Sequence, residues 1–129
     1  MKNKLLLVVA LVTIVFLGGA PVFAHHGNAA LDVGKKVTVK GVVTEWLWAN
    51  PHCWLKVDVK DDKGNVVNWV AETNNAADMM EKGWNSHSFK VGDEVTVTLE
   101  PVKNGKPAGK IIEVVLPTGQ TLGLGYLKK

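Results

Sequence analysis

The sequence predicts a small all-β domain with one short helix, a five-stranded OB-like barrel in the order β-β-β-α-β-β. Three observations favour this fold. Period-two patterns rich in valine and threonine recur in five segments, and one short segment has helical spacing instead. The first β segment is long enough to bend around a barrel, which closes most sheet edges. A small β-sandwich is the alternative.

The first predicted strand covers residues 35–48, where valines alternate with polar residues. Gly41 interrupts the alternation, so we expect a bulge or a bend there. Asn50 and Pro51 end the strand, because proline fixes its own φ and holds the preceding residue in an extended conformation.

The same pattern predicts four further strands, over residues 53–60, 66–72, 94–100 and 109–116. The aspartates and glycine of residues 61–65 form a hairpin turn between the second and third strands. Residues 119–127 are expected to add a frayed edge strand.

Apolar residues at helical spacing predict a short helix over residues 75–82. Gly83 ends it, and Met79 and Met80 follow its apolar stripe into the core. The candidates for the N-cap are Thr73, Asn74 and Asn75.

The N-terminal segment has the pattern of a secretory signal: two lysines, an apolar run over residues 5–20, and small residues before a cleavage site after Ala24. We therefore expect a cleaved signal peptide over 1–24, an irregular arm over 25–34 and the barrel domain over 35–129. An uncleaved anchor is the alternative, but the run is shorter than the roughly 20 residues of a spanning helix. The predicted location is the bacterial periplasm or the exterior, with no stable membrane insertion after cleavage.

Charge and cysteine content narrow the function classes. All 15 basic residues are lysines, and the formal net charge of +3 falls to about +1 once Lys2 and Lys4 are removed. A nearly neutral exported chain without arginine predicts no nucleic-acid partner. Cys53 is the only cysteine, so no internal disulfide forms, and we expect a buried, inert thiol.

The four histidines are the candidate metal ligands. Cleavage after Ala24 leaves His25 with a free amine beside its imidazole, a donor pair that suits Cu(II) or Ni(II), and His26 follows it. His52 lies in the rigid Asn-Pro-His loop, and His87 lies in the connection after the helix. A disordered terminus, a structural turn and a solvated loop are the alternative interpretations of these three places.

Tryptophans surround the Asn-Pro-His loop and suggest a different use for it. Asn50 and Pro51 present the loop, which in many OB barrels lines the ligand face. Trp46, Trp48 and Trp54 flank it, either as core residues or as an aromatic wall of a ligand site.

Several short motifs occur in one order along the chain: His25-His26-Gly27, Asn50-Pro51-His52, Trp69-Val70-Ala71-Glu72 and Gly83-Trp84. In this order they resemble an uncharacterised family of small exported bacterial proteins. The resemblance implies an exported single domain with an OB-like barrel, and it carries no activity.

The sequence contains no local catalytic signature, such as a nucleophile elbow, a phosphate-binding loop or a zinc-protease motif. We therefore expect a binding protein more than an enzyme. The leading hypothesis is an exported domain that binds a transition metal, copper above others, through His25, His26 and His52 with His87 in reserve. The alternative is a module that binds a non-metal ligand or a partner through the tryptophan-lined loop.

Overall fold

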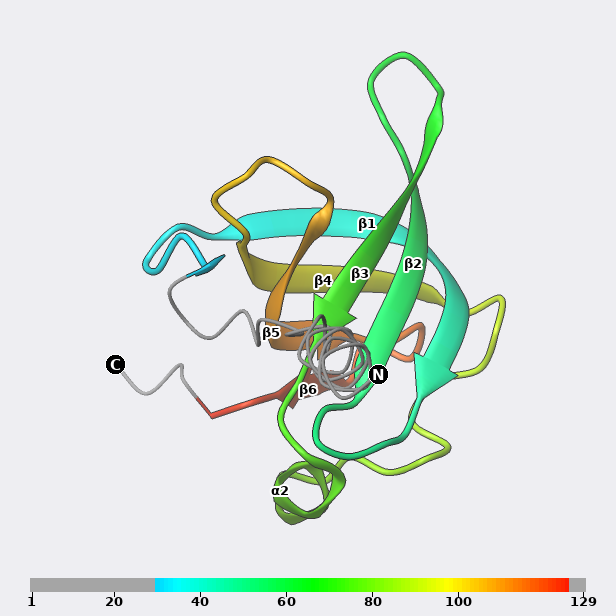
Figure 1. Cartoon of the computed structure of the whole chain (residues 1–129). Coiled ribbons are helices and arrows are strands. Elements are labelled where there is room, and N and C mark those ends of the chain that lie inside the picture. Colours follow the sequence, from blue (N-terminus) through cyan, green and yellow to red (C-terminus); the bar gives the residue numbers. More distant parts are fainter. Residues whose placement is uncertain (1–29, 126–129) are drawn as a thin grey trace, which may run out of the picture.

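A computed structural model describes residues 30–125, which form an all-β fold with one short helix (Figure 1). The elements are β1 (Val37–Leu47), β2 (Trp54–Lys60), β3 (Val66–Glu72), α2 (Ala76–Glu81), β4 (Glu94–Pro101), β5 (Ala108–Val115) and β6 (Thr121–Gly123). The predicted fold class and element order are confirmed.

Five of these strands close into a barrel. The strand order is β3-β2-β1-β4-β5-β6, and parallel pairing of residues 70–72 with residues 108–110 joins β3 to β5. β1 serves two neighbours, since residues 37–42 pair with β4 and residues 42–47 pair with β2. β6 is added along β5. This closed topology supports the barrel prediction over the sandwich.

Gly41 lies where β1 passes from one neighbour to the other. A Cβ atom at this position would lie 2.2 Å from the carbonyl oxygen of Asp58, so only glycine allows β1 to approach β2 this closely. We predicted a bulge or a bend at Gly41; the bulge is not there, because the register shifts between Val43 and Glu45. A close backbone approach, and not an extra residue, explains the glycine.

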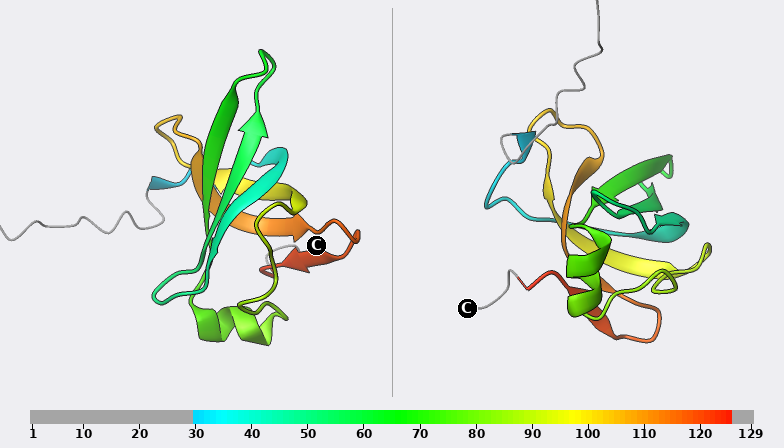
Figure 2. Two further views of the ribbon diagram at one scale, coloured as in Figure 1. Left: turned by 90° about the vertical axis from the view of Figure 1, so that its right-hand side faces the viewer. Right: turned by 60° about the horizontal axis from the view of Figure 1, so that its bottom comes forward.

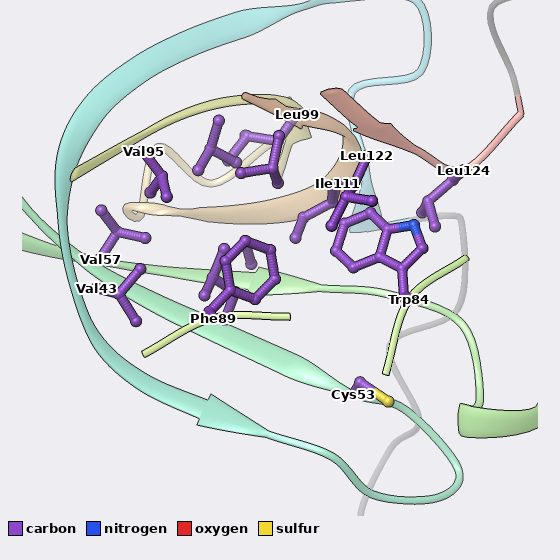
Figure 3. Packing of buried hydrophobic residues seen from close by; sticks show 14 of the residues in the cluster. Val43, Cys53, Val57, Trp84, Phe89, Val95, Leu99, Ile111, Leu122 and Leu124 are labelled. Atoms are coloured by element: carbon purple, nitrogen blue, oxygen red, sulfur yellow. The ribbon is translucent and has the colours of Figure 1, made fainter. Parts of the chain in front are cut away.

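The core fills the barrel and extends to the end where α2 lies (Figure 3). Inward-facing residues of β1, β2, β4 and β5 supply its aliphatic part, as alternation along each strand requires. Trp84 and Phe89, from the connection after α2, pack edge to face against each other, with ring centroids 5.7 Å apart. The Trp84 indole N–H donates to the Gly123 carbonyl oxygen at 3.1 Å, which satisfies the polar atom of the largest buried side chain.

Helix α2 is short and capped at its start. The side chain of Asn75 accepts a hydrogen bond from the Asp78 N–H, so Asn75 is the N-cap among the three candidates. Met79 is buried as predicted, but Met80 is 64% exposed, so its assignment to the core is wrong. Adjacent residues on a helix point about 100° apart, and a helix lying on one end of the barrel buries only one side.

The two ends of the barrel differ (Figure 2). Helix α2 lies at one end, and the turn of the β2–β3 hairpin projects from the other. Of the predicted arm, the described part includes Leu31, which forms an isolated bridge with Val102. The rest of the arm, the predicted signal peptide and the last four residues lie outside the described residues. Among residues 30–125, no helix has the length and apolarity needed to cross a membrane.

Candidate functional site

The loop between β1 and β2 is fastened to the segment that enters α2. The side-chain oxygen of Asn50 accepts from the Ala76 N–H at 3.0 Å, and the Asn50–Pro51 peptide bond is cis. Directly before β2, the Cys53 N–H donates to the Asn74 carbonyl oxygen at 3.1 Å. The loop that carries His52 is therefore held at both ends.

Thr73 is the buried polar residue under this loop, with none of its surface exposed. Its N–H donates to the Cys53 carbonyl oxygen at 2.9 Å. Its hydroxyl oxygen lies 3.1 Å from that same carbonyl oxygen and 2.9 Å from the Asn74 carbonyl oxygen. A hydroxyl placed between two carbonyl groups donates to them, so Thr73 ties the start of β2 to the end of β3.

The His52 imidazole makes two contacts through one nitrogen. Its Nδ1 atom lies 2.9 Å from the Thr73 carbonyl oxygen and 3.0 Å from Oε1 of Glu72. The carbonyl oxygen can only accept a hydrogen bond, and a carboxylate oxygen this close would repel a lone pair on Nδ1, so we infer that Nδ1 carries the hydrogen and donates it to the Thr73 carbonyl oxygen. In the neutral ring Nε2 then holds a lone pair, and within residues 30–125 it has no hydrogen-bond partner. The His52 side chain is 43% exposed.

The register of the hairpin explains why Glu72 meets His52. Trp54 and Glu72 are Cα partners across the β2–β3 ladder, so their side chains share a face. His52 precedes Trp54 by two residues and lies on that face as well. The sequence suggested no partner for Glu72. Counting outward from the turn at 61–65, one residue on each strand at a time, would have placed it beside this loop.

Trp54 lies on the outer face of β2. Its neighbour Leu55 is fully buried, and its Cα partner on β1 is Leu47, which is 46% exposed. The ring centroids of Trp54 and His52 lie 6.3 Å apart, with the planes at 72°. His52, Trp54, Leu47 and Glu72 thus form one continuous surface, which we call the His52 face.

Trp46 and Trp48 lie away from the His52 face. Trp46 packs against Trp84 and Phe89, with centroid separations of 6.0 and 5.0 Å, and Trp48 lies 5.8 Å from Trp46. The Trp46 indole N–H donates to the Asn85 carbonyl oxygen at 3.0 Å. Of the three candidate tryptophans, Trp46 and Trp48 therefore pack against the core, and Trp54 lies beside His52.

The other metal-ligand candidates are dispersed. His87 is exposed, and its Nδ1 lies 3.1 Å from the Ser86 hydroxyl oxygen. Cys53 is buried as predicted, with its thiol directed to the Ala49 carbonyl oxygen at 3.4 Å. His25 and His26 lie outside the described residues. In the part of the chain that the structure describes, no three His, Cys, Asp or Glu side chains are grouped to hold a metal ion.

An ionic network supports α2 beside the loop. The Lys82 ammonium group lies 2.6 Å from Oδ1 of Asp78, and the Asn74 side-chain amide donates to Oδ2 of Asp78. The hydrogen bond from Lys82, followed by that from Asn74, holds the pKa of Asp78 below its ordinary value. This network connects α2 to the segment that precedes it, and the first residue of α2, Ala76, also donates its N–H to Asn50.

Residues 13–111 match a family of unknown function, DUF6152. The chain belongs to this family. The match extends from the predicted signal segment to β5, so it includes the loop of His52 and the strand of Glu72. Membership in the DUF6152 family supports the resemblance to an uncharacterised family and assigns no activity. No curated protein matches the chain.

One solved structure is similar in fold. It is the Rim1 mitochondrial single-stranded DNA binding protein from S. cerevisiae, with a TM-score of 0.49 and 10% sequence identity. The similarity covers 64% of this chain and 93% of that one. At this level the comparison assigns no ligand to the DUF6152 chain.

This comparison corrects one sequence-based prediction. Charge and the absence of arginine predicted that nucleic acid is not a partner, but this structural neighbour is a single-stranded DNA binding protein. The prediction that nucleic acid is not a partner is therefore withdrawn. Net charge describes solubility and long-range attraction, whereas a ligand is selected by a local surface.

Proposed function

We propose that the domain, after export and cleavage of its signal peptide, binds a transition metal ion, with copper favoured. His52 supplies one imidazole nitrogen through Nε2. The amine and imidazole of His25 and the imidazole of His26 supply further nitrogen donors, as the sequence suggests. Nitrogen donors of this kind suit Cu(II), which binds more tightly than the other divalent first-row metals.

One observation carries the proposal: Nδ1 of His52 is occupied by the Thr73 carbonyl oxygen and by Glu72 Oε1. Histidines that ligate metals almost always donate their other ring N–H to a carbonyl or carboxylate oxygen, which fixes the tautomer and increases the basicity of the ligating nitrogen. His52 has the Thr73 carbonyl oxygen as the acceptor at Nδ1 and the Glu72 carboxylate beside it, and its Nε2 is left for a ligand.

His87 provides a contrast within the same domain. Its Nδ1 lies beside a hydroxyl, which both donates and accepts, so this neighbour does not select a tautomer. His87 also stands on an exposed connection, without a carboxylate partner among residues 30–125. We therefore retain His52 as the ligand on the barrel and use His87 as the matched control.

The test begins with protein exported under its own signal, with the N-terminus identified by intact mass. Metal content is measured before and after chelation, and Cu(II) uptake is titrated. We expect near-stoichiometric uptake, strongly weakened by one alanine inserted between Ala24 and His25 and by His52→Ala. Uptake that is indifferent to both changes would refute the proposal, and His87→Ala serves as the control.

A second candidate function has its own support on the His52 face. Trp54 is half-buried beside the exposed Leu47, and its indole N–H has no acceptor within the described residues. The outer face of the second and third strands, with the loop before them, is where OB folds bind oligonucleotides and oligosaccharides. A non-metal ligand that uses this face would lose affinity on Trp54→Ala and would be indifferent to chelators.

A further inference from the structure

We propose that Glu72 is a positioning residue, which acts through Nδ1 of His52 to make Nε2 the one ring nitrogen open to a ligand. This inference rests on the proposed function for the identity of the ligand. The tautomer itself is a property of the metal-free protein. It can therefore be measured whether or not the protein binds copper.

The two oxygen atoms near Nδ1, from Thr73 and Glu72, differ in how firmly their positions are fixed. The carbonyl group of Thr73 belongs to a backbone segment whose N–H is bonded to Cys53, so its position is set by strand pairing. Glu72 reaches Nδ1 through a side chain that is 30% exposed. The carbonyl oxygen supplies a fixed acceptor, and the carboxylate adds negative charge, which a carbonyl group cannot supply.

That charge has a chemical consequence at the far side of the ring. A carboxylate oxygen 3.0 Å from Nδ1 polarises the imidazole and raises the basicity of Nε2, which strengthens its bond to a metal ion. The charge acts together with the orientation of the ring, since the same contact restricts rotation of the side chain. Glu72 therefore affects both which nitrogen binds and how tightly it binds.

A purely structural role for Glu72 is the competing explanation. Both members of the His52–Glu72 pair are substantially exposed, and exposed ion pairs contribute little to stability. Glu45 offers the matched comparison, because it forms a 2.6 Å ion pair with Lys56 on the same outer surface and does not contact His52. Removing either charge should leave the barrel folded.

The experiment is 15N NMR of the histidine side chains in metal-free protein at about pH 8.5, well above the usual histidine range. It compares wild type, Glu72→Gln, Glu72→Ala and the control Glu45→Gln. We expect His52 to carry its hydrogen on Nδ1 in wild type, in Glu72→Gln and in the control. In Glu72→Ala the share of the hydrogen on Nδ1 should fall, because the Thr73 carbonyl oxygen alone then favours it.

Cu(II) titration of the same four proteins tests the consequence. Loss of an outer-shell partner typically weakens metal binding 10- to 100-fold, so we expect about a tenfold loss for Glu72→Gln, a larger loss for Glu72→Ala and none for Glu45→Gln. A wild-type His52 with its hydrogen on Nε2, or a Glu72→Ala protein identical to wild type in tautomer, would overturn the inference. If the tautomer moves as expected but no variant or wild type binds copper, Glu72 keeps its positioning role and the proposed function fails.

Discussion

The Nδ1 atom of His52 lies 3.0 Å from Oε1 of Glu72, across the end of the β2–β3 ladder. This contact brings together a residue of the Asn-Pro-His loop and a residue of the Trp-Val-Ala-Glu motif, two stretches that are distant in the sequence. Within residues 30–125, Nε2 of the same imidazole has no hydrogen-bond partner, and we propose that it binds the ligand.

Thr73 should be important for stability because its hydroxyl is buried between two carbonyl groups. Thr73→Val keeps the shape and removes the hydroxyl donor, while both carbonyl groups keep their backbone donors, so the expected cost is that of a lost hydrogen bond, about 0.5–1.5 kcal/mol. Urea unfolding measures the loss. Thr98→Val removes a hydroxyl that bonds only to the exposed Thr38 hydroxyl, and it should change stability by no more than about 0.5 kcal/mol. Equal effects of the two substitutions would contradict this assignment.

Gly41 should tolerate no side chain. In Gly41→Ala the new Cβ would meet the Asp58 carbonyl oxygen at 2.2 Å, which is backbone and cannot move aside cheaply. We expect destabilisation of roughly 1–3 kcal/mol or more. Gly123→Ala is the control, because the nearest atoms to its Cβ lie 3.9 Å away. Thermal unfolding measures both variants. A melting temperature lower for Gly123→Ala than for Gly41→Ala would show that the close approach is not required.

Asp78 should make stability depend on acid pH. Its pKa is lowered in the folded protein by Lys82 and Asn74, so the folded state binds its proton less readily than the unfolded state. The stabilisation is complete above the unfolded value of about 3.9 and is lost as the pH falls through the folded value. The stability difference between wild type and Asp78→Asn should therefore be constant near neutrality and shrink below about pH 4. A stability difference between wild type and Asp78→Asn that increases on acidification would contradict this prediction.

Substitutions of Trp48 and Trp54 should distinguish an effect on folding from an effect on ligand binding. Trp48 packs on the aromatic part of the core, so Trp48→Ala should lower the free energy of unfolding by roughly 1 kcal/mol or more beyond the loss in Trp54→Ala. Chemical denaturation of both variants measures this difference. If the domain binds a non-metal ligand on the His52 face, Trp54→Ala should abolish that binding in a folded protein. A ligand lost only with Trp48 would point to the other side of the loop.

The sequence predicted the elements well where local pattern decides them. The alternation of apolar and polar residues predicted the strands. The helix begins after the N-cap Asn75 and ends before Gly83, which has a positive φ, as the spacing of the apolar residues suggested. The sequence-based prediction failed where contacts with a distant segment determine the structure. The clash that requires Gly41 comes from Asp58 on another strand, and the exposure of Met80 follows from how little of α2 the barrel covers.

The candidate site was predicted in part. The rigid loop and His52 follow from Asn50 and Pro51, but the partner of His52 depends on hairpin register, which period-two alternation leaves open. The separation of Trp54 from Trp46 also depends on the bulge near Val43, because one extra residue reverses which face a side chain occupies. The contributions of His25 and His26 remain predictions.

The most direct test is the Cu(II) dissociation constant of the exported, mass-verified protein, measured side by side for wild type, His52→Ala and His87→Ala. Removing His52 should weaken binding more than about tenfold, because a metal ligand held in place at its Nδ1 atom is lost. Removing His87 should leave the dissociation constant unchanged. Equal dissociation constants for wild type and His52→Ala would contradict the assignment of Nε2 as a metal ligand.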